Sequence, residues 1–426
     1  MSEALAIAAV LLLGAAGWRA AAPRGALPAL PTAVVWGGLA VTAWLAVLQF
    51  AGVRWSVGVL AVPVVAAAIL LLVTPTPVRG PAGEGRLWAG VAAAAVAPAV
   101  LLAAASPVGG WDFRYIWGLK ARAFALAGAH DASWLAWPGH LFAHPDYPPM
   151  WPDLLAAAAI AGGEATRAAA LWHAVAVAAL AAACWWAAGA APAPLRTLAA
   201  VAGAWVPVML LPAYAGYAEP LLALAAVVAL ATLRDRDGPA PPSPWVLAAG
   251  IAALSLVKNE GTALAAGVAL AGAWTARGRA RAVIAAGLLP AVAWHVLRLA
   301  NGIPGEPFVL SPAFLAGRLG ELPAAFARTL RVDVVVLLVA WGLVLVALGG
   351  REQRGVRVAL AVWGIVALVT YVGAAPDLAW RLEGSLDRVL AAPLPATIAL
   401  ALGSSLRPRA AARPGPGSAP GAAPFA

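Results

Sequence analysis

The sequence predicts an all-α, polytopic membrane protein. Of its 426 residues, 63% are hydrophobic and only 11% are charged, whereas a soluble domain carries about a quarter charged residues. Apolar runs of about eighteen residues or more recur along the chain, and each run is a candidate transmembrane helix. These observations exclude an ordinary soluble domain.

We expect a single integral membrane domain, residues 1–406, with about 12–14 transmembrane helices. The first apolar run lacks a basic n-region and carries Glu3, so we interpret it as a membrane helix and not as a cleaved signal. The tail, residues 407–426, is rich in Pro, Gly and Ala, and we expect it to be disordered and cytoplasmic. In chain order, the candidate spans are residues 4–21, 30–51, 55–75, 87–106, 148–162, 166–189, 195–212, 217–233, 244–257, 260–275, 281–299, 332–349, 356–375 and 387–403.

Arginine placement predicts the orientation of these spans, because positively charged residues concentrate in cytoplasmic loops. Counting from either end of the chain puts the arginine-rich turns and the tail on one side, taken as cytoplasmic. The two counts disagree by one crossing between residues 148 and 195. Either the short 148–162 segment is re-entrant, or one span is misplaced. The segments that fall outside are 107–147, 300–331, 376–386 and those around Glu219 and Lys258.

Composition also limits the kinds of partner. The net charge of +10 comes from basic residues at the ends of apolar runs, which is typical of membrane topology and does not indicate nucleic acid binding. Cys184 is the only cysteine, so a single chain can form neither a disulfide framework nor a cysteine zinc cluster. We therefore expect membrane lipids, and no nucleic acid, as partners.

The 107–147 loop collects acids, bases, aromatic residues and prolines between two apolar runs. Asp112 follows two glycines that allow the chain to turn tightly as it leaves the membrane. A carboxylate between two aromatic residues can act as a general base on a hydroxyl, although a helix cap or a pair with the neighbouring arginine would also explain it. Residues 117–127 are typical of a short amphipathic helix, either at the membrane surface or within an ordinary loop.

His144, Asp146 and Tyr147 end this loop, just before two prolines that suit the first turn of a helix. His144 and Asp146 are close enough in the chain to share a ligand or a metal. Two potential ligands do not define a metal site, so we predict no metal site and no cofactor, with a divalent metal left open. The alternative is a stiff helix entry with solvated polar residues.

Later apolar runs carry further ionisable residues. Glu219 opens one span, where a helix-capping role alone would explain it. Lys258 and Glu260 interrupt one long apolar stretch; ionisable groups at membrane depth are expensive and usually functional, but an external turn is the alternative. Lys258 is a compact charge that suits a phosphate. Arg381 and Arg388 precede the last span, where they would bind a phosphate or anchor the helix end.

With these residues in place, the chain resembles the GT-C superfamily of membrane glycosyltransferases, especially bacterial protein mannosyltransferases and aminoarabinose transferases. Asp112, the amphipathic segment and Tyr147-Pro148-Pro149-Met150 follow the order of that family's motifs. Glu219, and Lys258-Asn259-Glu260-Gly261 as a loose match to a Lys-Gly element, extend the resemblance over residues 100–275. Four candidate spans precede the loop where the family usually has one. Asp112 also lacks the acidic neighbour that the family has, which favours a single-base mechanism without metal.

The resemblance implies an inverting enzyme of the bacterial inner membrane that takes a sugar from a polyprenyl-phosphate carrier on the extracytoplasmic side. Asp112 would deprotonate a hydroxyl of an envelope glycan, lipid or protein, and Lys258 with Arg381 or Arg388 would stabilise the departing phosphate. Two other functions stay open: a transporter or flippase of lipid-linked sugars, and a non-catalytic partner in an envelope assembly. The residues expected to bind sugar and acceptor are His144, Asp146, Tyr147, Glu219 and Glu260.

Overall fold

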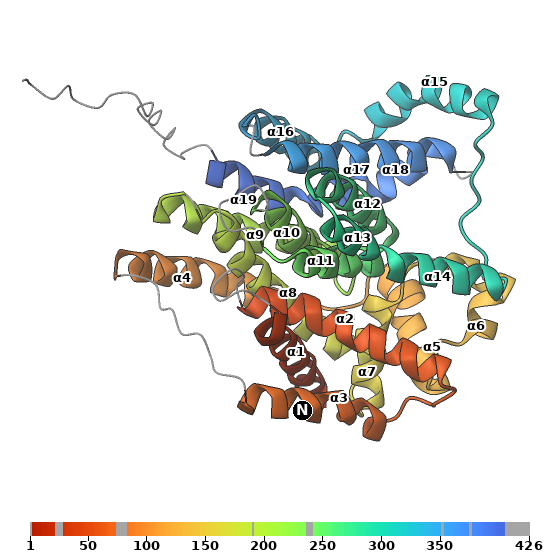
Figure 1. Ribbon diagram of the computed structural model, residues 1–426. Coiled ribbons are helices and arrows are strands. Elements are labelled where there is room, and N and C mark those ends of the chain that lie inside the picture. The colour runs from red at the N-terminus through yellow and green to blue at the C-terminus, as the bar shows by residue number, and fades with distance from the viewer. Residues whose placement is uncertain are drawn as a thin grey trace, which may run out of the picture.

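The protein is helical throughout the part of the chain that the structure describes. The computed structural model describes residues 2–21, 29–73, 83–189, 191–235, 242–350, 353–374 and 377–404; the predicted tail, 407–426, lies outside them. Within these residues the one departure from helix and loop is an isolated antiparallel bridge between Phe308 and Ala374. The helices pack around a large hydrophobic core (Figure 1). The predicted all-α class is confirmed.

The chain forms many helices of very different lengths, as Figure 1 shows. In order they are α1 (Ser2–Ala21), α2 (Ala29–Phe50), α3 (Val57–Val73), α4 (Gly83–Ala105), the π-helical turn η1 (Phe113–Trp117), α5 (Gly118–Ala127), α6 (Ala132–Ala136), the 3₁₀ turn η2 (Pro138–Ala143), α7 (Met150–Ile160), α8 (Ala165–Ala187), α9 (Ala193–Tyr214), α10 (Glu219–Asp235), α11 (Pro244–Val257), α12 (Asn259–Thr275), α13 (Arg279–Ala286), α14 (Leu289–Ala300), α15 (Pro312–Thr329), α16 (Val332–Ala347), α17 (Arg354–Gly373), α18 (Leu378–Ala391) and α19 (Leu394–Ser404).

The protein is a multi-pass membrane protein, with fewer long spans than the 12–14 predicted. Among the described residues, six helical segments are long and apolar enough to cross a bilayer, or eight if each of two bent helix pairs counts as one span. The difference arises because several predicted spans form short helices: α3 has 17 residues and α11 has 14. A transmembrane helix usually needs about 20 residues. In addition, α18 and α19 together make one span, Leu378–Ser404.

Helix α7 corresponds to the segment on which the two topology counts disagree. Met150, at its start, lies against Gly38 in the middle of α2, and Gly163, just after its end, lies against Glu3 of α1. Because α7 has only 11 residues and nine of them are buried, it covers part of the thickness of the protein and starts deep inside it. A short, buried helix of this kind is what the re-entrant alternative predicts.

Glycines allow the closest helix crossings. A Cβ atom added at Gly14 would lie 1.9 Å from the backbone oxygen of Ala33, so α1 and α2 touch backbone to backbone. A Cβ atom at Gly267 would lie 2.4 Å from the backbone oxygen of Ala359, where α12 crosses α17. Small residues at helix interfaces are typical of membrane proteins, in which van der Waals packing drives helix association.

Acidic residues and arginines mark opposite ends of two of the helices. Glu219 starts α10 and Arg234 lies in its last turn; Glu260 lies in the first turn of α12, and Arg281 reaches back to the backbone oxygen of Ala276 beyond its end. We use two names for these ends. The acidic end holds Asp112, Asp146, Glu219, Glu260 and Glu306, and the arginine end holds Arg19, Arg196, Arg234, Arg281 and Arg357.

Candidate functional site

Asp112 lies at the acidic end, one residue before the π-helical turn η1. Its backbone N–H donates to the hydroxyl oxygen of Tyr217, with the two atoms 3.0 Å apart. Its carboxylate oxygen Oδ2 lies 2.5 Å from Nη1 of Arg388. The π-helical geometry of η1 widens the helix locally, a feature found frequently at functional sites. Asp112 is thus anchored to segments more than 100 residues away in the chain.

One face of α18 supplies cations and a hydroxyl to the acidic end. Arg381, Ser385 and Arg388 follow one another at spacings of four and three residues, so they lie on the same side of the helix. The hydroxyl groups of Ser385 and Tyr371 are 2.9 Å apart. Arg388 also reaches Oε1 of Glu219, at 3.5 Å, and its guanidinium group lies 5.2 Å from the ring centroid of Tyr217. Arg388 therefore links Asp112 to Glu219.

Lys258 is the centre of a buried ion-pair chain. It has extended backbone angles and separates α11 from α12, and its residue is only 3% exposed. Its Nζ atom lies 2.9 Å from Oε1 of Glu219 and 3.1 Å from Oε1 of Glu260. Burying a charge is expensive unless it is paired, so the two carboxylates explain how a lysine is held there.

Asp146 and Tyr147 approach the same ion-pair chain from the loop that precedes α7. Oδ2 of Asp146 accepts a hydrogen bond from the Asn259 amide at 3.0 Å, and its backbone oxygen accepts one from the Trp294 indole at 2.9 Å. The Nζ atoms of Lys120 and Lys258 lie 5.6 and 5.9 Å from the Tyr147 ring centroid. The Tyr147 ring thus contacts both lysines of the chain through cation–π interactions.

His144 holds an unusual backbone conformation beside Tyr147. Its φ of 45° makes it the one residue other than glycine with positive φ among the described residues, a conformation that costs energy and clusters at functional sites. Its ring stacks on that of Tyr147, with the centroids 4.7 Å apart. Burial lowers the pKa of His144, which favours a neutral imidazole at pH 7. Its backbone oxygen accepts a hydrogen bond from Lys120, at 2.6 Å.

Lys120 differs from the other cations at this end. It is 1% exposed, and within the described ranges no carboxylate lies at ion-pair distance from its Nζ atom. Burial lowers the pKa of Lys120 to about 7, although the negative charge of Asp146 opposes this shift. An ammonium group has three donors, and the His144 oxygen takes one of them. Lys120 is thus a buried group that an anion would hold in its charged form.

Arg381 has a partner that the sequence did not predict. Its Nη2 atom lies 2.5 Å from Oε2 of Glu306, and its Nη1 atom contacts the other oxygen of the same carboxylate. Glu306 lies in the loop between α14 and α15, in the segment expected to be outside. The pair is bidentate, an arrangement that adds geometric specificity as well as energy. It fixes this loop to the first half of α18.

Four buried oxygen atoms in this region accept no hydrogen bond from the described residues: Oδ1 of Asp146, Oε2 of Glu219, Oε2 of Glu260 and Oδ1 of Asn259. Buried acceptors are normally satisfied, so these four suit a ligand rich in hydroxyl or amine donors. A metal ion fits less well, because no group of three or more His, Cys, Asp or Glu side chains arranged as ligands occurs in the described parts of the chain.

The structure brings all of the residues predicted for the site to the acidic end. We call this set the polar cluster: Asp112, His144, Asp146, Tyr147, Glu219, Lys258, Glu260, Arg381 and Arg388. Sequence reasoning did not assign a role to Glu306, Tyr217 or Asn259, which belong to the same network. It placed Lys120 only in an amphipathic helix. The scarcity of lysine was the available signal, because Lys120 and Lys258 are the chain's only two.

Comparison with known proteins does not assign the chain to a family. The chain matches no family model, no curated protein and no solved structure. The arrangement of the polar cluster and its chemistry therefore carry the functional argument.

Proposed function

We propose that the protein is a membrane glycosyltransferase that moves a sugar from a polyprenyl-phosphate carrier to a hydroxyl group on the extracytoplasmic side. The observation that carries this proposal is the joint presence of three elements within the polar cluster and around it. They are a carboxylate paired with a guanidinium, a buried lysine without a carboxylate partner in the described chain, and buried acceptor oxygens. A base, an anion site and a hydroxyl-binding site are what such a transfer needs.

Asp112 is the proposed general base. It would accept the proton of the acceptor hydroxyl while that oxygen attacks the anomeric carbon of the sugar. The bond from this carbon to the phosphate oxygen breaks, the electron pair stays with the phosphate, and the configuration inverts. Because Arg388 now holds the Asp112 carboxylate at 2.5 Å, the pair has to open first. A phosphate competes well with a carboxylate for a guanidinium group, because each of the two anions can form bidentate hydrogen bonds with it.

The departing phosphate is assigned to Lys120 and Arg388. Lys258 was expected from the sequence to stabilise this group, but its charge is already shared by Glu219 and Glu260. Among the described residues, Lys120 donates a hydrogen bond to His144 and otherwise faces the rings of Trp117 and Tyr147; a phosphate beside it would favour its charged form. Preorganised cations aimed at developing negative charge are usually the largest single contribution to catalysis.

The sugar hydroxyls are assigned to the acceptor oxygens of Asp146, Glu219, Glu260 and Asn259. These oxygens are buried and accept no hydrogen bond from the described residues. A site built to hydrogen-bond hydroxyl groups discriminates strongly against ligands that lack them, because its polar atoms would then stay unpaired. Lys258 holds the two glutamates in place and acts as a positioning residue.

The test is lipid mass spectrometry on protein purified in mild detergent, comparing wild type with Asp112→Asn. We expect a polyprenyl-phosphate-linked sugar to be enriched in the variant, because the donor binds and transfer is blocked. Asp131→Asn is the matched control: Asp131 caps α6 in the same loop and lies outside the polar cluster, and Asn caps a helix as well as Asp does. The absence of such a lipid from every sample would contradict the proposal.

A further inference from the structure

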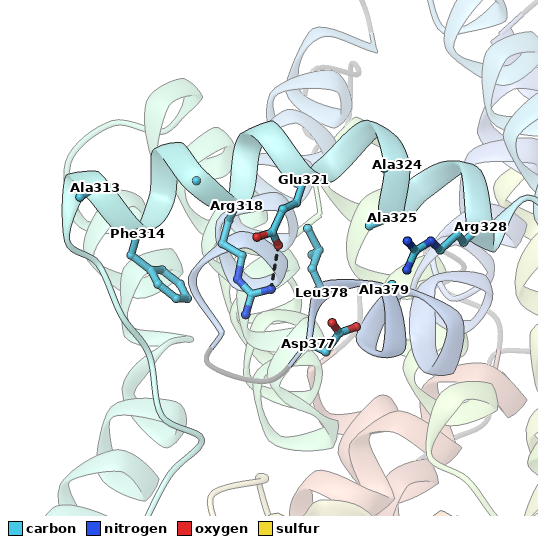
Figure 2. A pocket seen from close by; sticks show the side chains of 11 residues that line it. Ala313, Phe314, Arg318, Glu321, Ala324, Ala325, Arg328, Asp377, Leu378 and Ala379 are labelled. Carbon is cyan, nitrogen blue, oxygen red and sulfur yellow. Dashed lines mark hydrogen bonds and ion pairs between the residues drawn. The ribbon is translucent and has the colours of Figure 1, made fainter.

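A second candidate site lies between α15 and the first turn of α18, next to the polar cluster but separate from it. A cavity of about 550 Å³ opens there, within the usual range for small-molecule sites, about 300–1,000 Å³. Figure 2 shows α15 along one side and the start of α18 along the other. Neither Arg381 nor Arg388 is among the residues that line this cavity, so the proposed transfer reaction makes no use of it.

The charged side chains in the cavity are two arginines and two acids, with Arg318, Glu321 and Arg328 on α15 and Asp377 at the start of α18. Arg318 and Glu321 form an ion pair of 3.1 Å. The Asp377 carboxylate accepts the backbone N–H of Trp380 through Oδ1, at 2.8 Å. Within the described ranges Arg328 forms no ion pair, and Asp377 has no cationic partner.

This arrangement favours a ligand that carries both a positive and a negative charge. A simple anion would meet the carboxylates of Glu321 and Asp377, and a simple cation would meet the two guanidinium groups. In Figure 2 the Arg318 and Arg328 side chains descend from α15 on either side of the Asp377 carboxylate. A guanidinium binds a phosphate through paired hydrogen bonds, and a carboxylate suits an ammonium group.

The walls of the cavity and its surroundings suit an amphiphile. Phe314, Leu378 and small alanine and glycine residues line it between the charges. Trp380, which follows the lining residue Ala379 in the chain, is 68% exposed. Tryptophan is enriched at the membrane–water interface. Helix α15 is bent by 112° relative to α16, so it does not simply continue that helix across the membrane.

We propose that this cavity binds a zwitterionic group made of one phosphate and one amine, as carried by the headgroup of a phosphatidylethanolamine lipid. Arg328 and Arg318 would hold the phosphate, and Asp377 would hold the amine. The start of the lipid tails would contact Phe314 and the small alanine and glycine residues that line the cavity. The site stands independently of the proposed transferase activity.

Native mass spectrometry of the full chain, exchanged into equal amounts of phosphatidylethanolamine and phosphatidylglycerol, tests the proposal. We expect wild type to retain phosphatidylethanolamine in preference. Arg328→Gln should weaken that retention about tenfold, the change that corresponds to about 1.4 kcal/mol. Asp377→Asn keeps the helix cap but removes the negative charge, so it should shift the preference toward phosphatidylglycerol. Arg167→Gln, at an exposed arginine far along the chain from the cavity, is the control. It should change neither the retention of phosphatidylethanolamine nor the preference between the two lipids.

Equal retention of the two lipids by wild type, or the same preference in wild type and in both cavity variants, would overturn the proposal. Calorimetric titration with soluble phosphoethanolamine separates the two sources of the ligand. Binding of phosphoethanolamine that Arg328→Gln weakens, together with the lipid preference, supports a headgroup site. Binding of phosphoethanolamine without any lipid preference would overturn the assignment to a lipid.

Discussion

The two ends of the helix bundle use arginine in different ways. At the arginine end, Arg234 and Arg357 donate to backbone oxygens where neighbouring helices end, at 2.5 and 2.8 Å, and Arg234 also pairs with the adjacent Asp235. At the acidic end, Arg381 and Arg388 pair with carboxylates that lie 75 and 276 residues away in the chain. The last carbonyl groups of a helix have no partner within it, so the first kind of contact completes secondary structure. The arginine–carboxylate pairs at the acidic end bring opposite charges together in a buried region. Completing the helices does not require such pairs.

The largest expected effect on stability comes from Lys258→Met. The change leaves Glu260 without an ion-pair partner among the described residues and leaves Glu219 with Arg388 alone, at 3.5 Å, and breaking a buried ion pair costs about 3–5 kcal/mol. We expect a clear fall in the thermal unfolding temperature in detergent. Glu219→Gln should cost less, because Lys258 keeps Glu260 as a partner. An unchanged unfolding temperature for Lys258→Met would show that these charges are not coupled as the structure describes.

Asp112→Asn should have the largest effect on activity. Loss of a general base slows a reaction by about 10²–10⁴-fold, whereas the unfolding temperature should stay close to that of wild type, since Arg388 keeps Glu219 as a partner. The measurement is sugar transfer in proteoliposomes supplied with the donor lipid that mass spectrometry identifies. Transfer at the wild-type rate would remove Asp112 from the mechanism.

The sequence predicted the membrane-helical class, and it singled out residues that the structure brings together, but it did not predict which residues pair with which. Asp112, Glu219, Lys258 and Arg388 stood out because each interrupts or ends an apolar run, where a charge is expensive. Their convergence followed from topology, since loops on one side of a membrane share a surface. The number of long spans was overestimated, because hydropathy alone does not show where an apolar run breaks into short helices such as α11 and α12.

Contacts between distant segments could not be predicted from one sequence. Glu306 pairs with Arg381 across 75 residues, and Asn259 donates to Asp146 across 113. Neither pair has a local spacing that would reveal it. The role of Lys120 was missed for another reason: the residues around it suggested a surface helix, whereas the side chain points into the protein and is 1% exposed.

A pH effect of intermediate size is expected from Lys120, whose pKa is lowered to about 7 by burial. Below that pH the side chain is charged and binds an anion; above it, affinity for the phosphate-bearing donor should fall, by at most about tenfold per pH unit. Lys120→Arg stays charged and should flatten this dependence. Donor-lipid affinity measured between pH 6 and 9 tests the effect, and a flat profile for wild type would exclude Lys120 as the anion-binding group.

The free energy of unfolding should also depend on the protonation of Lys120, but it should rise with pH where the affinity for the donor falls. The unfolded chain keeps the ordinary lysine pKa of 10.5, so between about pH 7 and that value the unfolded state binds more protons. The Lys120 contribution to the free energy of unfolding should therefore rise with pH in this window. Comparing the pH dependence of unfolding of wild type with that of Lys120→Met isolates it.

The smallest effect is expected for Arg167→Gln. Arg167 and Glu164 form an ion pair whose side chains are 73% and 64% exposed, and such surface pairs contribute about 0–1 kcal/mol. Both the unfolding temperature and donor retention should match those of wild type. A large effect on either would mean that charge at the protein surface, and not the polar cluster, governs the behaviour.

The most direct test of the difference between the two ends compares Arg388→Lys with Arg234→Lys in one experiment. Both variants keep the positive charge but lose the forked guanidinium, which lysine does not reproduce. Thermal unfolding and retention of the donor lipid are measured side by side. The account predicts that Arg388→Lys loses donor retention at least about tenfold, whereas Arg234→Lys retains the lipid. Equal retention by the two variants would contradict the claim that the acidic end is the functional one.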